Sequence, residues 1–367
     1  MRKFIFLITF SILCLFILCS SVGALEISAK GAVLIEAESG DIVYGKNEHI
    51  KLPMASTTKI MTALVVLDNA ELDEIVTIEP CMVGIEGSSV YLRVGEKLTV
   101  QDLLYALLLE SANDASVALA IHVSGSIDDF AVLMNEKAKE LGLESTHFSN
   151  PHGLDQEEHY TTPYELGVIA ASAMKNEAFT KIVSTKKAVI PSFDGEGSRV
   201  LINHNKLLRS YEGAIGIKTG FTKKCGRCLV SCAVRDGVML ICVTLNAPND
   251  WQDHKNMLDY GFTQYESISL ATPYCYTVEL NAIGGNKGSF LAQNCDTLQV
   301  TLKRQKHNIC AVLETNRFVS APIRKGDLVG AIVYYDNDKV IGRVPLYAKE
   351  SVEKLSYKKS FFERLFS

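Results

Sequence analysis

Two pairs of apolar, β-like runs constrain the fold more than any other feature of the sequence. The first pair is Gly31–Glu36 and Asp41–Tyr44. The second pair is Cys228–Val234 and Val238–Leu245, separated by a turn that contains Asp-Gly, a strong hairpin signal between apolar runs. Helical patterns fill the interval between the pairs. This order predicts an α+β fold, with helices packed on an antiparallel sheet whose first and last strands lie far apart in the sequence.

Start and stop signals place several helices in that interval. Thr99 precedes the apolar run Val100–Leu109 as a cap, and Thr162-Pro163 is a cap followed by proline at the first helical position. Another helix is expected over Asp128–Leu141, where Gly142 ends it. The run from Ser56 to Leu67 is apolar nearly all round, which predicts a buried helix.

The residue pattern of the sequence changes after Gly261. Short β-like runs separated by turns continue to about residue 348, which predicts a small all-β domain. We therefore expect a larger first domain over residues 25–265, the β-rich domain over residues 266–348, and a separate tail over residues 349–367.

The two ends of the chain carry targeting patterns. Arg2 and Lys3 precede an apolar run, and small residues up to Ala24 suit cleavage there, so residues 1–24 are predicted to be a signal peptide. An uncleaved membrane anchor is the alternative, whereas the large Leu18 before Cys19 disfavours lipid attachment. In the tail, apolar and basic side chains separate onto two sides, which predicts contact with an anionic membrane surface. We expect an exported chain attached to the outer face of the cytoplasmic membrane.

Composition narrows the function classes. The chain has 367 residues, 47% hydrophobic residues and a net charge of −5, which indicate a globular protein and argue against a general nucleic-acid binder. Ten cysteines are scattered, two of them in the leader; the other eight fit disulfides and buried free thiols equally well, so no particular disulfide is predicted. Cys225 and Cys228 have the spacing of a metal knuckle, but no second pair matches, so neither a metal nor a cofactor is predicted.

Three short polar motifs stand in order along the chain. In the first, Ser56 and Lys59 lie three residues apart and share one face of a helix, where a neutral amine can activate a serine hydroxyl. The second is Ser111-Ala112-Asn113, a polar break between two apolar helices that suits side chains pointing into a cleft. The third is Lys218-Thr219-Gly220 on the strand Ala214–Thr222.

Each motif alone has a plain alternative: a helix cap with a surface lysine for the first, a helix cap for Asn113, and a solvated strand-edge charge for Lys218. The ordered set is specific, however, because it is the signature of penicillin-binding proteins and class A β-lactamases. Flanking stretches resemble the low-molecular-mass D-alanyl-D-alanine carboxypeptidases over roughly residues 25–262. They include Gly87-Ser88-Ser89, Asn150-Pro151-His152-Gly153-Leu154 and Gly216–Thr222.

This resemblance implies a β-lactamase/transpeptidase-like fold and a serine-type hydrolase. It implies that the enzyme removes the terminal D-alanine from peptidoglycan stem pentapeptides and is acylated by β-lactam antibiotics. Ser56, Lys59 and Ser111 would be catalytic. The expected substrate-binding residues are Asn113, Lys218, Thr219, Gly220 and Phe221.

Three other functions remain open at this point. A β-lactamase shares the motifs, but no Glu-x-x-Leu-Asn lies between residues 150 and 200. A peptidoglycan endopeptidase uses the same chemistry, and a non-catalytic cell-wall-binding protein would keep only the fold.

His152 and His159 are expected at the rim of the cleft.

Overall fold

The computed structural model describes residues 25–193 and 197–355, which divide into two units. The first unit holds residues 25–235 and 239–262, and the second holds residues 236–238 and 263–355. The predicted signal peptide and most of the predicted amphipathic tail lie outside the described residues.

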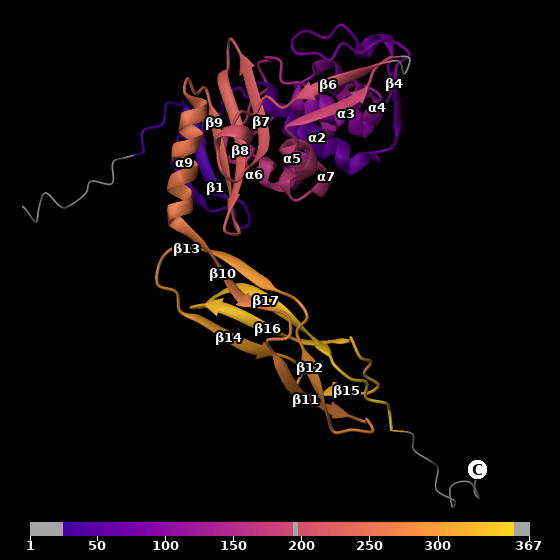
Figure 1. Cartoon of the computed structure of the whole chain (residues 1–367), viewed down its shortest axis with the longest axis vertical. Coiled ribbons are helices and arrows are strands. Elements are labelled where there is room, and N and C mark those ends of the chain that lie inside the picture. Colours follow the sequence, from indigo (N-terminus) through magenta and orange to yellow (C-terminus); the bar gives the residue numbers. More distant parts are fainter. Residues whose placement is uncertain (1–24, 194–196, 356–367) are drawn as a thin grey trace, which may run out of the picture. The chain divides into compact units, whose positions relative to one another are not determined.

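An antiparallel sheet is the centre of the first unit (Figure 1). Its strand order is β2 (Ile42–Lys46), β1 (Gly31–Glu36), β9 (Val238–Leu245), β8 (Gly226–Arg235) and β7 (Ala214–Thr222). The α+β organisation expected from the two hairpins is therefore confirmed. Strand β1 pairs with β9 over its whole length, from Gly31 opposite Leu245 to Glu36 opposite Leu240.

Helices bury both faces of this sheet. Along β1 the side chains alternate: Val33 and Ile35 lie against Gly167 of α6 (Pro163–Met174), and Leu34 lies against Gly261 of α9 (Asp250–Gln264). This explains why β1 is apolar from Ala32 to Ile35, since a strand covered on both faces has no polar side.

The remaining helices of the first unit form the layer that carries the first two motifs. They are η1 (Ala55–Thr58), α2 (Lys59–Asn69), η2 (Pro80–Met82), α3 (Val100–Leu109), α4 (Asn113–Ser124), α5 (Ile127–Glu140), α7 (Glu177–Ser184) and α8 (Leu207–Ser210). Two hairpins accompany them: β3 (Ile75–Thr77) with β4 (Lys97–Thr99), and β5 (Lys187–Pro191) with β6 (Ser198–Ile202).

Local signals begin the helices as expected. The Thr99 side chain accepts a hydrogen bond from the Asp102 N–H while Asp102 Oδ2 accepts one from the Thr99 N–H, which is a complete capping box at α3. Thr162 likewise caps α6 by accepting from the Glu165 N–H.

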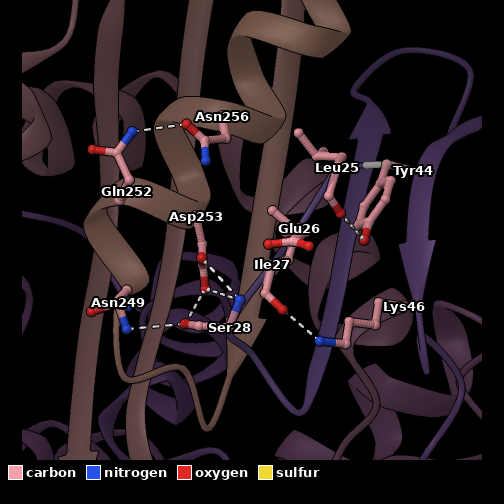
Figure 2. Close-up of a pocket in the computed structure, with 10 residues that line it drawn as sticks. All are labelled: Leu25, Glu26, Ile27, Ser28, Tyr44, Lys46, Asn249, Gln252, Asp253 and Asn256. Atoms are coloured by element: carbon pink, nitrogen blue, oxygen red, sulfur yellow. Dashed lines mark hydrogen bonds between the residues drawn. The ribbon is translucent and has the colours of Figure 1, made fainter. Parts of the chain in front are cut away.

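The segment before β1 is fixed by long-range contacts (Figure 2). Asp253 of α9 accepts hydrogen bonds from the Ser28 N–H and the Ser28 hydroxyl. It also accepts one from the Ala29 N–H. Tyr44 donates to the Leu25 carbonyl. The start of the described chain is thus tied to β2 and to α9.

The second unit is all-β, as predicted. One of its sheets has the order β14 (Ile309–Glu314), β16 (Leu328–Asp336), β17 (Lys339–Ala348), β12 (Ser289–Gln293), β11 (Thr277–Ile283) and β15 (Val319–Ser320). A separate pair joins β10 (Tyr265–Ala271) to β13 (Leu298–Lys303). The core of the second unit includes Phe290, Val344 and Leu346.

Within the described ranges, none of the helices is by itself both long and apolar enough to span a membrane. The pair α4 and α5, bent by 82°, meets that length and composition test only jointly.

Candidate active site

Ser56 lies on the short 3-10 helix η1, and Lys59 is the first residue of α2. The predicted helix therefore begins three residues later than expected. The predicted contact is nevertheless present, because residues i and i+3 eclipse in a 3-10 turn. Lys59 Nζ lies 3.1 Å from Ser56 Oγ, which is within hydrogen-bond distance.

Lys59 is fully buried. Its amine also donates to Asn113 Oδ1 at 2.7 Å and to the His152 carbonyl at 2.6 Å. Burial lowers the pKa of Lys59 well below its usual range, and the nearby Lys218 lowers it further, while Asp114 opposes the shift. The environment therefore favours the neutral amine, which is the form that can accept a proton.

The turn that carries Ser56 is held under backbone strain. Ala55 has φ of 49°, a left-handed conformation that is rare for a residue with a side chain. The Thr57 hydroxyl donates to the Met54 carbonyl at 2.6 Å, and the Thr58 hydroxyl donates to the Ala55 carbonyl at 2.7 Å. A strained turn over-determined in this way is typical of functional sites.

His159 is buried beneath this turn, so the expectation of a rim position was wrong for it. Its Nδ1 accepts a hydrogen bond from the Ser149 N–H at 3.0 Å, which leaves the ring proton on Nε2. Nε2 then donates to Thr58 Oγ1 at 2.7 Å. Burial lowers the pKa of His159 to about 3, so the ring is neutral and bridges the loop to the serine turn.

Ser111 and Asn113 lie at the junction of α3 and α4, as their sequence position suggested. Ser111 is in the left-handed region with φ of 61°. Asn113 is buried as the first residue of α4; its oxygen binds Lys59 and its amide nitrogen donates to the Glu86 carbonyl. Asn113 is therefore committed to Lys59 and to the loop before Gly87, and is not a simple helix cap.

Asp114 organises the same loop, and the sequence argument missed it. Its carboxylate accepts hydrogen bonds from the Ser89 hydroxyl and from the N–H groups of Val90 and Leu92. The only signal available was an acidic residue directly after the second motif.

Strand β7 carries the third motif along the other side of the Ser56 turn. A Cβ atom on Gly220 would lie 3.1 Å from the backbone nitrogens of both Ser56 and Thr57, so the strand backbone approaches the turn closely because residue 220 is glycine. Lys218 is 1% exposed, which excludes a solvated edge charge. Burial lowers its pKa to about 7, and its amine donates to the Thr219 carbonyl at 3.0 Å.

An open cavity of about 340 Å³ joins the motifs. Ser56, Ser111, Thr219, Gly220 and Phe221 line it. The lining also contains residues that the sequence argument did not single out, namely Ser88, His204, Lys206, Arg227, Asp250 and Trp251. Lys59, Asn113 and Lys218 are buried and are not part of the lining.

In the part of the chain that the structure describes, no three His, Cys, Asp or Glu side chains gather in a way that could hold a metal ion. The eight cysteines found there are free thiols, and Cys225 and Cys228 are buried. The Ser56 hydroxyl lies at the wall of an open cavity and within hydrogen-bond distance of the buried Lys59 amine. This arrangement suits acyl transfer through the serine.

Comparison with known proteins agrees with this chemistry. A family model described as D-alanyl-D-alanine carboxypeptidase matches residues 19–249, and one described as the C-terminal domain of penicillin-binding protein 5 matches residues 281–354. The chain is 33% identical to the D-alanyl-D-alanine carboxypeptidase DacF of Bacillus subtilis over 340 residues, which is 90% of this chain and 87% of that relative.

Other relatives share one or both units. The D-alanyl-D-alanine carboxypeptidase of Streptomyces sp. strain K15 is 39% identical, over 64% of this chain and 88% of its own length. The crystal structure of penicillin-binding protein 5 from Haemophilus influenzae is similar with a TM-score of 0.66 and 28% identity, covering 91% of this chain and all of that one. The resemblance indicated by the sequence motifs is confirmed, and the chain belongs to the D-alanyl-D-alanine carboxypeptidase family of serine peptidases.

Proposed function

We propose that this chain is a serine-type D-Ala-D-Ala carboxypeptidase that removes the terminal D-alanine from peptidoglycan stem pentapeptides through an acyl-enzyme on Ser56. One observation carries the proposal: the Ser56 hydroxyl lies 3.1 Å from the amine of a fully buried Lys59. Family membership supports it over the β-lactamase and non-catalytic alternatives.

The first step is acylation. Ser56 Oγ attacks the carbonyl carbon of the penultimate D-alanine, and neutral Lys59 takes the hydroxyl proton. Asn113 and the His152 carbonyl hold the amine by accepting two of its hydrogens, which leaves a lone pair free to face Ser56. The charge on the tetrahedral oxygen needs fixed donors, and we assign this role to the N–H groups of Ser56 and Phe221.

The second step releases the leaving group. The C–N bond breaks, and the D-alanine amine receives a proton relayed through Ser111, which lines the same cavity as Ser56. Thr219 binds the terminal carboxylate of the substrate, and the nearby Lys218 supports it through the positive charge that it carries below its pKa of about 7. Water then hydrolyses the ester and restores the Ser56 hydroxyl.

The same attack opens a β-lactam ring. Because the leaving nitrogen stays covalently attached to the acyl group, it cannot diffuse away, and the acyl-enzyme persists. Mass spectrometry after incubation with benzylpenicillin is therefore expected to find one adduct, on Ser56. Release of D-alanine from diacetyl-Lys-D-Ala-D-Ala tests the reaction itself, with Ser56→Ala as the inactive control. A folded wild-type protein that shows neither the adduct nor D-alanine release would refute the proposed function.

We also propose that the mature enzyme works outside the cytoplasmic membrane, beside its substrate. The cationic and apolar pattern of residues 1–24 and the amphipathic pattern of residues 351–367 support this placement. Deleting residues 351–367 is expected to move the protein from the membrane pellet to the soluble fraction with unchanged D-alanine release. Continued sedimentation of the truncated chain with membranes would rule out the tail as the anchor.

A further inference from the structure

Glu110 stands directly before Ser111 and joins the second motif to a neighbouring strand. It ends helix α3, and strand β6 runs beside that helix (Figure 1). Its Oε1 accepts a hydrogen bond at 2.6 Å from the N–H of Ile202, the last residue of β6. Its Oε2 lies 3.1 Å from Nε2 of His204. One carboxylate therefore holds two points of the chain around the end of β6.

Both residues that Glu110 joins in this way belong to the catalytic cavity. Ser111 is its neighbour in the chain, His204 is bonded to its side chain, and both line the cavity beside Ser56. The segment that carries His204 is also held from behind, where Asn203 Nδ2 donates to the Val183 carbonyl at 3.0 Å. The Glu110 carboxylate is thus a direct link between that segment and the second motif.

Ser111 needs support of this kind because its backbone is in the left-handed region, with φ of 61°. A residue with a side chain keeps such a conformation only where its surroundings over-determine it. After Ser111, the Asn113 N–H donates to the Ser88 carbonyl at 2.7 Å. Before it, the side chain of Glu110 fixes the chain to β6.

The same carboxylate acts on Lys218 of β7 through its charge. Burial lowers the pKa of Lys218 to about 7, and the negative charge of Glu110 opposes this shift. Lys59 of α2 is the other buried amine nearby. The remaining ionisable side chains of the cavity wall are His204, Lys206, Arg227 and Asp250. Glu110 therefore favours the charged form of Lys218.

We propose that Glu110 is a positioning residue of this enzyme, whose carboxylate holds Ser111 and the His204 segment beside Ser56 and provides the counter-charge of Lys218. The inference rests on the proposed function, in which Ser111 relays a proton to the leaving amine and Lys218 supports binding of the substrate's carboxylate. Glu110 is not part of the cavity lining, so it acts through these neighbours and not on the substrate.

Two variants of the full-length enzyme test the positioning role through kcat for D-alanine release from diacetyl-Lys-D-Ala-D-Ala. Glu110→Ala removes both contacts and is expected to lower kcat about tenfold, since a small misplacement of a reacting group can cost up to about 10²-fold. Glu110→Gln keeps an oxygen that can accept from the Ile202 N–H. It is therefore expected to restore kcat to within about threefold of the wild type.

The pH dependence of KM tests the counter-charge. Lys218 is protonated below its pKa, so KM of the wild type is expected to rise as the pH increases through about 7. In Glu110→Gln the opposing charge is gone and the pKa of Lys218 falls further, so KM is expected to rise at a lower pH. A purely structural role of Glu110 would leave this pH unchanged.

A second glutamate–histidine pair in the same unit provides the matched control. Glu74 Oε1 accepts from the Glu71 N–H at 2.7 Å, and Glu74 Oε2 lies 3.0 Å from Nε2 of His122. Neither side chain lines the catalytic cavity. Glu74→Ala and Glu74→Gln are therefore expected to keep the kcat of the wild type and its dependence of KM on pH.

The outcomes separate the inference from the proposed function. A folded Glu110→Ala with the kcat of the wild type overturns the positioning role, and coincident KM profiles of Glu110→Gln and the wild type overturn the counter-charge. If circular dichroism shows that Glu110→Ala does not fold, Glu110→Gln decides through its KM profile. A wild type that neither releases D-alanine nor forms the Ser56 adduct refutes the proposed function instead.

Discussion

Lys59 has no solvent to stabilise a positive charge. Its amine is buried, and the other lysine of the site, Lys218, lies close enough to disfavour that charge further. Besides Ser56 Oγ, the amine contacts Asn113 Oδ1 and the His152 carbonyl oxygen, and both of these are neutral acceptors. The arrangement thus positions the amine without supplying a carboxylate partner that would keep it protonated.

The pH dependence of acylation follows from this environment. The lowered pKa favours the neutral form of Lys59, and protonation removes the base as the pH falls through that pKa. The second-order rate constant for labelling by fluorescent penicillin is therefore expected to fall on acidification and to need no alkaline activation. Lys59→Arg, whose guanidinium stays protonated, is expected to lose about 10²–10⁴ in rate. A rate that rises only near pH 10 would contradict the lowered pKa of Lys59, and a rate that survives in Lys59→Arg would show that Lys59 is not the base.

Thr58 and His159 act on the site through the serine turn. Thr58→Val removes the hydroxyl that joins His159 Nε2 to the Ala55 carbonyl, and it leaves the buried ring N–H without a partner, at a cost of about 1–3 kcal/mol. We expect slower acylation by penicillin and a lower midpoint of thermal unfolding. Thr58→Ser keeps the hydroxyl and is expected to restore the acylation rate; equal rates for the Val and Ser variants would contradict this bridge.

Reasoning from the sequence correctly predicted contacts between residues that are close together in the chain. Ser56 and Lys59 are three positions apart, so any helical turn brings them together. His159 lies 101 positions from Thr58, and no local pattern announces that contact. Arg227 was also missed, because its position in the cavity wall depends on the strand register that places it opposite Phe221.

At the scale of elements, the loop that contains Gly153 closes over the serine turn. Gly153 has φ of +87°, and a Cβ atom there would lie 2.1 Å from the Ala55 carbonyl oxygen. The adjacent His152 carbonyl accepts the hydrogen bond from Lys59. Displacing this loop would therefore move both the nucleophile's turn and a partner of the base.

Gly153→Ala tests this packing against Gly142→Ala. Gly142 also has a positive φ, +74°, but a Cβ atom there meets nothing within 4 Å. Both variants carry the left-handed backbone penalty of about 1–2 kcal/mol, and only Gly153→Ala also clashes with backbone. We expect penicillin acylation to drop at least tenfold in Gly153→Ala and to stay near wild type in Gly142→Ala. Similar acylation in both variants would mean that the loop does not position the site.

Elements with their own start signals were predicted well. Helices α3 and α6 begin where Thr99 and Thr162 cap them, and the hairpin of β8 and β9 follows its Asp-Gly turn. Helix α9 was not predicted, because much of its buried face is polar. His254 on that face forms hydrogen bonds with Ser231 of β8 and Thr244 of β9. A helix with polar residues on its buried face lacks the periodic apolar spacing from which a helix is predicted.

At the scale of the whole molecule, every residue assigned to catalysis belongs to the first unit. That unit has its own core, which extends from β1 to β9. A chain of residues 25–264 is therefore expected to fold and to form the Ser56 adduct with penicillin at a rate within about twofold of the full chain. Circular dichroism separates the outcomes: a folded fragment that fails to acylate would show that the second unit contributes to the site.

The pairing of β1 with β9 has a consequence for synthesis. Strand β1 lies inside the catalytic sheet, between β2 and β9, and β9 emerges from the ribosome about two hundred residues after β1. At roughly 5–20 residues per second, one edge of this largely apolar strand stays unpaired for tens of seconds. An unpaired strand edge can pair with other strands, so the nascent chain is exposed to mispairing until β9 arrives. A ribosome that stops before residue 238 leaves a product that has the nucleophile and its lysine but lacks β9, the strand that joins β1 to β8.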